Sequence, residues 1–204
     1  MAEPAPLRLF AALVHFPVVN KQGDLVTSSV TTLDVHDMSR ICRTYGVETL
    51  FVVTPLEVQR ELVGQIIDHW QTGFGATYNP TRKEALGITR VTGTLQEAIA
   101  EVEEATGGTP QILVPDARRF PNVMSYPRAR KMLQQGGVYL ILFGTAWGLD
   151  PSQVERADIV LAPIEGRSGY RHLPVRAAAA VILDRLLGES RAGEGNSIET
   201  GDET

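Results

Sequence analysis

Three short segments of this sequence carry glycine or proline and few charged side chains, and each directly follows an apolar run. They are Pro115-Asp116, Gly144–Gly148 and Ala162–Gly166. Glycine lets a backbone approach a ligand closely and leaves its N–H and C=O groups free. Such groups can bind a neutral, flat molecule such as an adenine ring without any charged side chain. Taken singly, each segment also fits an ordinary turn.

A second group of candidate residues is polar and surrounds the start of the first predicted helix. A His–Asp pair in such a cluster can act as a general base near neutral pH. The alternative is that Asp34 and Asp37 stabilise the helix N-terminus while His36 is merely solvated. Both interpretations stay open for the whole cluster: His15, Asn20, Asp34, His36, Asp37 and Arg40.

Two more candidate catalytic residues, Asn79 and Arg82, lie in the stretch 72–82. An arginine there can clamp a phosphate or position a reacting group. A purely structural loop explains the same residues equally well. The neighbouring Trp70 is more typical of a core residue than of a platform for base stacking.

A run of basic residues with few acids between them follows the first of the three segments. Such a patch can bind the phosphate backbone of RNA, and a solvated helix face is the alternative. The candidate RNA-binding residues are Arg118, Arg119, Arg128, Arg130 and Lys131.

Several common sites are not supported by the sequence. There is no P-loop motif, and Tyr78 stands where a dinucleotide fingerprint starting at Gly73 and Gly75 would need its third glycine. The four histidines are dispersed, so we expect no metal site. Cys42 is the one cysteine, and we expect a small buried core residue rather than a nucleophile.

The elements that must position these residues alternate along the chain. Apolar runs typical of strands lie at 7–14, 48–54, 88–92, 111–114, 138–143 and 157–163. Helical patterns lie between them at about 33–45, 55–70, 94–106, 126–135 and 173–187. This alternation predicts an α/β fold with a mostly parallel sheet covered by helices on both faces. The stretch 72–82 carries too many Gly, Asn and Pro residues for us to expect a regular element there.

Charge and length divide the chain into one domain, 1–188, and a tail, 189–204. The tail holds five acids and one base, so the body keeps 19 of the 24 acids and 18 of the 19 bases. We expect the tail to be disordered, because it has a single large apolar residue. No apolar stretch is long enough to span a membrane. We interpret 7–14 as a first strand rather than a signal peptide and expect a cytoplasmic protein.

The sequence from 111 onward resembles the C-terminal half of the SPOUT, or α/β-knot, methyltransferases. The resemblance rests on a strand ending in Pro-Asp, on LILFGTAWGL and on LAPIEGRSGYRHLPVRAAAAVILDRLL. The N-terminal half, with LVHFPVVNKQGDLVTSSVTTLDVHD and HWQTGFGATYNPTR, is similar to one SPOUT family of bacterial SAM-dependent RNA methyltransferases. The likeness covers roughly residues 7–188.

The resemblance implies a deep C-terminal trefoil knot and a homodimer with its active site near the subunit interface. It also implies that the knot loops bind S-adenosyl-L-methionine (SAM) mainly through backbone groups. The residues His172-Leu173-Pro174 occupy the place of a Ser-Leu-Asn motif that is commoner in SPOUT proteins. We therefore assign this chain no role that depends on that serine or asparagine. Carried onto this chain, the cofactor-binding positions are Pro115, Gly144, Thr145, Gly148, Pro163, Ile164, Gly169, Leu173 and Pro174.

The function that these features predict is methyl transfer from SAM to tRNA or rRNA. The alternatives are a non-catalytic SAM- or nucleotide-binding module, such as a regulatory partner of another RNA enzyme, and an unrelated doubly wound protein with its site at the same strand ends.

Overall fold

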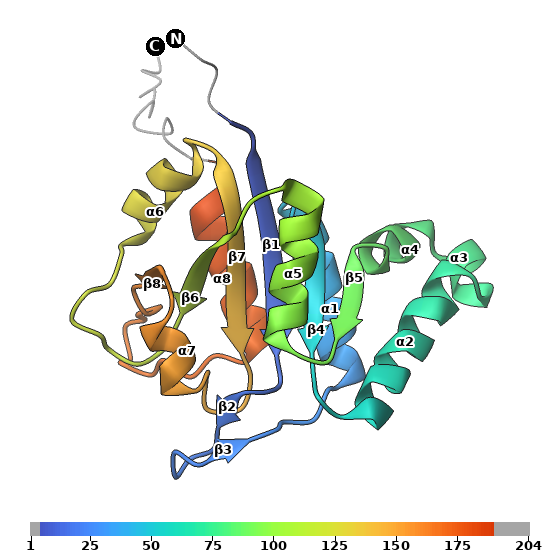
Figure 1. The fold of residues 1–204 in the computed structure, drawn as a ribbon, viewed down its shortest axis with the longest axis horizontal. Helices are drawn as coiled ribbons and strands as arrows, with labels where there is room; N and C mark the ends of the chain where they lie inside the picture. The colour runs from blue at the N-terminus through green and yellow to red at the C-terminus, as the bar shows by residue number, and fades with distance from the viewer. Residues whose placement is uncertain (1–4, 190–204) are drawn as a thin grey trace, which may run out of the picture.

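A six-stranded sheet with only parallel pairings forms the centre of the molecule (Figure 1). The computed structural model describes residues 5–189, so nearly all of the tail predicted at 189–204 lies outside it. The strand order is β5-β4-β1-β7-β6-β8. The strands are β1 (Leu7–Val14), β4 (Thr49–Val53), β5 (Thr89–Thr92), β6 (Gln111–Pro115), β7 (Gly137–Gly144) and β8 (Ile159–Leu161).

Alternate residues of the strands face two hydrophobic layers. Leu9, Ala11 and Leu13 of β1 pack with α1 (Thr32–Thr44), α6 (Tyr126–Leu133) and α8 (Val175–Leu187). Phe10 and Ala12 face the other side, where α5 (Leu95–Thr106) and α7 (Pro151–Glu155) pack. Figure 1 shows α5 in front of the strands and α8 behind them. The prediction of a parallel sheet with helices on both faces is therefore confirmed.

Helix boundaries follow capping chemistry, as the sequence predicted in part. The Thr94 hydroxyl accepts a hydrogen bond from the Glu97 backbone N–H, and the Glu97 carboxylate accepts one from Gly93 N–H at 2.7 Å. Helix α1 begins one residue earlier than predicted, because Thr31 is its N-cap and accepts from Asp34 N–H. Helix α2 (Glu57–Gln71) begins two residues after the predicted start.

The expectation that 72–82 forms no regular element is wrong. Two short helices, α3 (Phe74–Tyr78) and α4 (Pro80–Leu86), occupy it. The residues that suggested a loop instead mark helix ends. Asn79 ends α3, and its side chain accepts from Arg82 N–H to cap α4, where Pro80 takes the first position.

A small hairpin also occupies a segment that the sequence suggested was a loop. Strands β2 (Val18–Val19) and β3 (Leu25–Val26) pair antiparallel below the carboxyl end of β1 in Figure 1. Within the described residues, no helix has the length and apolar character needed to cross a membrane. The Cys42 thiol is fully buried, and burial raises its pKa to about 12, which agrees with a core role.

Candidate functional site

A large cavity opens where the strands β1, β6, β7 and β8 end. Its volume is about 1120 Å³, which is enough for a nucleotide-sized ligand. Its walls come from 19–23, 28–34, 115–118, 143–149 and 164–182. Carboxyl ends of parallel strands are where open α/β sheets bind their ligands. We call this hollow the SAM cavity, after the cofactor that the SPOUT resemblance implies.

The wall segment 144–148 is a tight loop that depends on glycine. A Cβ atom at Gly144 would lie 2.6 Å from the backbone nitrogen of Leu149 and 3.0 Å from the carbonyl carbon of Gly148. Gly148 itself has φ +105°. Because a side chain at Gly144 would collide with backbone, only glycine lets the chain fold back on itself here.

The β2–β3 hairpin fixes this loop from below. Val19 N–H donates to the carbonyl of Gly148 at 3.0 Å, and Trp147 N–H donates to the carbonyl of Val19 at 3.1 Å. Val18 also forms a bridge with Leu149. Segments about 130 residues apart in sequence therefore form one rigid wall.

A buried chain of side-chain hydrogen bonds supports the same loop. The Thr145 hydroxyl donates to the carbonyl of Val14 at 2.9 Å, so it accepts from Ser28 across 2.5 Å. Ser28 in turn accepts the Nδ1–H of His15 at 2.9 Å. His15 is fully buried, and burial lowers its pKa to about 4 against the opposing effect of Asp34. It is therefore a neutral support beneath Ser28 and Thr145.

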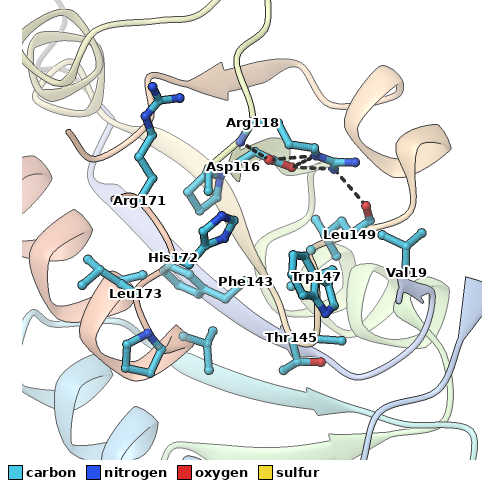
Figure 2. A pocket seen from close by; sticks show the side chains of 18 of the residues that line it. Val19, Asp116, Arg118, Phe143, Thr145, Trp147, Leu149, Arg171, His172 and Leu173 are labelled. Carbon is cyan, nitrogen blue, oxygen red and sulfur yellow. Dashed lines mark hydrogen bonds and ion pairs between the residues drawn. The ribbon is translucent and has the colours of Figure 1, made fainter. Parts of the chain in front are cut away.

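The carboxylates that line the cavity are both paired with arginine. Asp116 receives Arg118 Nη2 at 2.6 Å, and Arg118 also donates to the carbonyl of Leu149 at 3.0 Å (Figure 2). That hydrogen bond to Asp116 raises the pKa of Arg118. Asp34, at the start of α1, is held by Arg176 of α8 at 2.9 Å. Both carboxylates of the cavity walls are thus neutralised by an arginine.

A family model described as SAM-dependent RNA methyltransferase matches residues 8–188. The chain belongs to this family. The SPOUT resemblance predicted from the sequence is confirmed at this level, and SAM is the cofactor. The cavity fits SAM, because it is large enough for a nucleotide-sized ligand and its two carboxylates are neutralised by arginines.

Named relatives support the same assignment. A tRNA (guanine-N(1)-)-methyltransferase of Oleidesulfovibrio alaskensis is 43% identical over 89% of this chain and 42% of its own length. One of Nitratidesulfovibrio vulgaris is 42% identical over the same shares. The chain therefore spans about two fifths of the length of these relatives. An uncharacterized protein of Aquifex aeolicus is 37% identical over 90% of both chains.

Solved structures share the fold. A probable methyltransferase from Bordetella pertussis has a TM-score of 0.57 at 18% identity, over 88% of this chain and 92% of its own. The TrmH/SpoU tRNA modifying enzyme of A. aeolicus has a TM-score of 0.52 at 15% identity, over 91% and 76%. At such identities the likeness concerns the fold alone.

Most cofactor-binding positions predicted for this methyltransferase come together in the cavity. Pro163 and Gly169 do not line it, although Gly169 lies within the wall segment 164–182 and Pro163 directly precedes it. The seven that line it are Pro115, Gly144, Thr145, Gly148, Ile164, Leu173 and Pro174.

The six candidate catalytic residues separate into three places. Asn20 and Asp34 line the cavity. The Asn20 amide oxygen accepts from the N–H groups of Gln22 and Asp24, so this side chain shapes the hairpin turn. His15 is buried beneath the cavity, as described above. The remaining three lie around α1, α2 and α4, away from the cavity: His36, Asn79 and Arg82.

The basic residues suggested as RNA contacts are also scattered. Arg118 is part of the cavity wall, and Arg119 forms an exposed ion pair with Glu165 at 2.9 Å. Arg130 donates to the carbonyls of Asp184 and Arg185 near the end of α8. Arg128 and Lys131 are exposed on α6.

The sequence did not single out the aromatic rim of the cavity. Trp147 and Tyr170 lie 5.7 and 5.6 Å from the ring of His172 and are 52% and 69% exposed. Figure 2 shows His172 and Trp147 above Phe143 and Thr145. Aromatic residues in or just after two of the segments, Trp147 within 144–148 and Tyr170 after 162–166, were the signal that could have identified this rim.

Proposed function

We propose that this methyltransferase modifies tRNA and binds SAM in the cavity between the loops after β6, β7 and β8. The observation that carries the proposal is the cavity at the strand ends, where the glycine-dependent loop 144–148 forms one wall and the carboxylates are already paired. Bound SAM supplies an electrophilic methyl group on a sulfonium. The tRNA assignment is supported by the names of the two longer relatives.

The chain's own residues have separable tasks in this proposal. Backbone groups of 144–148 recognise the adenine, and Asp116 with Arg118 keeps the loop in place. The aromatic rim residues Trp147 and His172 flank the entrance, where a flat base can stack.

We infer that Asp34 accepts the proton of the methyl acceptor. Of the six candidate catalytic residues it is the only titratable one that lines the cavity. Arg176 and the Thr31 hydroxyl hold its carboxylate in one orientation, at 2.9 and 2.6 Å. An oriented carboxylate beside the cavity meets the geometric demand on a general base.

The variant Asp34→Asn tests this role, because an amide oxygen can still accept from Arg176. We expect methyl transfer to fall at least a hundredfold, since general bases contribute about 10²–10⁴, while SAM affinity stays unchanged. Full transfer activity in the variant would remove Asp34 from the mechanism. Mass spectrometry of the product nucleosides would identify the methylated atom.

The resemblance to SPOUT enzymes supports three further proposals: a deep C-terminal trefoil knot, a homodimer and a cytoplasmic location. Exposed apolar residues on α1 and beside the cavity, Leu33 at 60% and Leu173 at 42%, suit a subunit contact. Sedimentation equilibrium measures the assembly, and a monomer at micromolar concentration would contradict the dimer.

A further inference from the structure

A second, shallower cavity of about 540 Å³ lies between α1 and α4. None of its lining residues lines the SAM cavity. Three arginines surround it: Arg40, Arg43 and Arg82. Arg43 is paired with Glu84, whereas no carboxylate within residues 5–189 forms an ion pair with Arg40 or Arg82. The cavity therefore carries uncompensated positive charge.

Two buried nitrogen atoms near this cavity have no hydrogen-bond partner within the described part of the chain. They are Nε of Arg82 and Nδ1 of His36. The central carbon of the Arg82 guanidinium lies 4.8 Å from the centroid of the Trp70 ring. The His36 ring packs against the same Trp70 ring at an interplanar angle of 90°, with the two centroids 5.6 Å apart. A buried polar group without a partner is unfavourable. The half-buried Arg82 guanidinium therefore keeps donor capacity that the described protein does not use.

The electrostatic environment points in the same direction. The pKa of His36 is lowered, first by burial and then by the charge of Arg82, with smaller contributions from Arg40 and His69. Asp37 opposes this effect, but it is itself engaged by Arg176 at 3.2 Å. Positive potential from several elements thus meets at this cavity, as an anion-binding site requires.

Next to the cavity, α3 presents two aromatic rings to solvent. Phe74 is 77% and Tyr78 76% exposed, and their rings stack at 5.9 Å with an interplanar angle of 22°. Helix α3 can lie here because Gly75 touches the Trp70 ring, where a Cβ would come within 2.7 Å. Tyr78 directly precedes Asn79, which lines the cavity. The aromatic pair and the arginines therefore form one surface.

We propose that this surface, the α1–α4 corner formed by Arg40, Arg82, Phe74 and Tyr78, docks a single-stranded part of the RNA substrate. A phosphodiester group binds in the cavity, and an unpaired base stacks on the exposed aromatic pair. The assignment rests on the proposed function, which supplies RNA as the partner. Unpaired cations beside exposed stacked rings match a polyanion that carries flat bases.

The position on α1 fits an RNA that reaches both sites. Asp34 lines the SAM cavity, and Arg43 lines the second cavity nine residues later. Nine residues of helix span about 14 Å. The corner therefore contacts nucleotides adjacent to the methylated one rather than the acceptor itself.

The test compares binding of unmodified tRNA transcripts to full-length protein by fluorescence anisotropy. We expect the double variant Phe74→Ala with Tyr78→Ala, and separately Arg82→Gln, each to weaken RNA binding about tenfold. SAM affinity should stay within twofold of the parent. Val58→Ala, exposed on α2, and Arg156→Gln, exposed just after α7, are controls that should leave RNA affinity unchanged.

Each outcome decides the matter. Unchanged RNA affinity in both variants overturns the corner as a docking surface, and a parent that still methylates RNA leaves the proposed function intact. A parent that binds no RNA overturns both proposals together. If the variant Phe74→Ala with Tyr78→Ala is a monomer where the parent is a dimer, and its RNA affinity is unchanged, the corner is a subunit contact. That result also overturns the proposal.

Discussion

The SAM cavity and the α1–α4 corner differ in whether their charged side chains form ion pairs. In the cavity, Asp34 and Asp116 are each held by an arginine, which leaves backbone groups to bind. In the corner, Arg40 and Arg82 have no carboxylate partner in the described chain. A cavity whose carboxylates are paired suits a cofactor that carries charges of both signs, and an uncompensated cationic corner suits a polyanion. Pairing of charges, rather than their number, separates the two sites.

The largest effect is expected from Gly144→Val. A Cβ at this position would lie 2.6 Å from the Leu149 nitrogen, so the loop 144–148 must move. We expect SAM affinity to fall more than a hundredfold by calorimetry, while RNA binding at the corner persists. Gly166→Ala is the matched control, because nothing lies within 4 Å of a Cβ there.

Retained SAM affinity in Gly144→Val would break the assignment of the cavity. Thermal unfolding of the variant separates a local loop change from global unfolding, since only the latter would abolish RNA binding as well.

The next effect concerns stability and pH. Burial holds the pKa of His15 at about 4, below its ordinary 6.5, so the unfolded chain binds a proton more readily. Stability is therefore complete above pH 6.5 and falls as the pH drops toward 4, by up to about 3 kcal/mol. Urea unfolding at pH 7.5 and 4.5 measures this loss.

The variant His15→Asn isolates that contribution, because its amide can still donate to Ser28 but does not titrate. We expect a smaller pH dependence than in the parent. An identical pH dependence would show that other groups cause the acid instability.

Arg118 and Arg119 offer a finer division between cofactor and RNA roles. Arg118 fixes Asp116 and the Leu149 carbonyl, so Arg118→Ala should weaken SAM binding about tenfold through the unpaired Asp116 and the loosened loop. Arg119 forms only an exposed pair with Glu165, and Arg119→Ala should leave SAM affinity unchanged. Equal SAM affinity in the two variants would contradict this division.

The smallest effect is expected at the rim of the corner. Glu84→Gln releases Arg43 from its ion pair and adds one free cation to the cavity. RNA affinity at low salt should rise by a few-fold, and the logarithmic salt slope should steepen by about 0.7. A decrease in RNA affinity would show that the Arg43–Glu84 pair itself shapes the site.

Much of the scaffold was predictable from local sequence signals. Apolar runs such as 138–143 predicted strands, and the glycine segments after them marked the edge that carries the cavity. Helices α3 and α4 were missed because Pro80 and Asn79 serve as helix start and cap, a role that resembles loop chemistry in sequence. The packing of Gly75 on the Trp70 ring favours the helix over a loop. This is a tertiary contact, which local sequence does not reveal.

The site was predictable only where its residues act through backbone. In the sequence itself, Gly144 and Gly148 indicate that two backbone segments approach each other closely. By contrast, Ser28 meets Thr145 across 117 residues, and nothing local signals that contact. The same limit grouped His36 with Asp34, whereas only Asp34 of the two lines the SAM cavity.

Methyl transfer from radiolabelled SAM to unmodified tRNA transcripts tests the central claim most directly. We expect the parent to incorporate label into tRNA, Gly144→Val to incorporate none at matched SAM concentration, and Gly166→Ala to match the parent. A parent that binds SAM but transfers no label to any RNA, or a Gly144→Val variant with parental activity, would contradict the account.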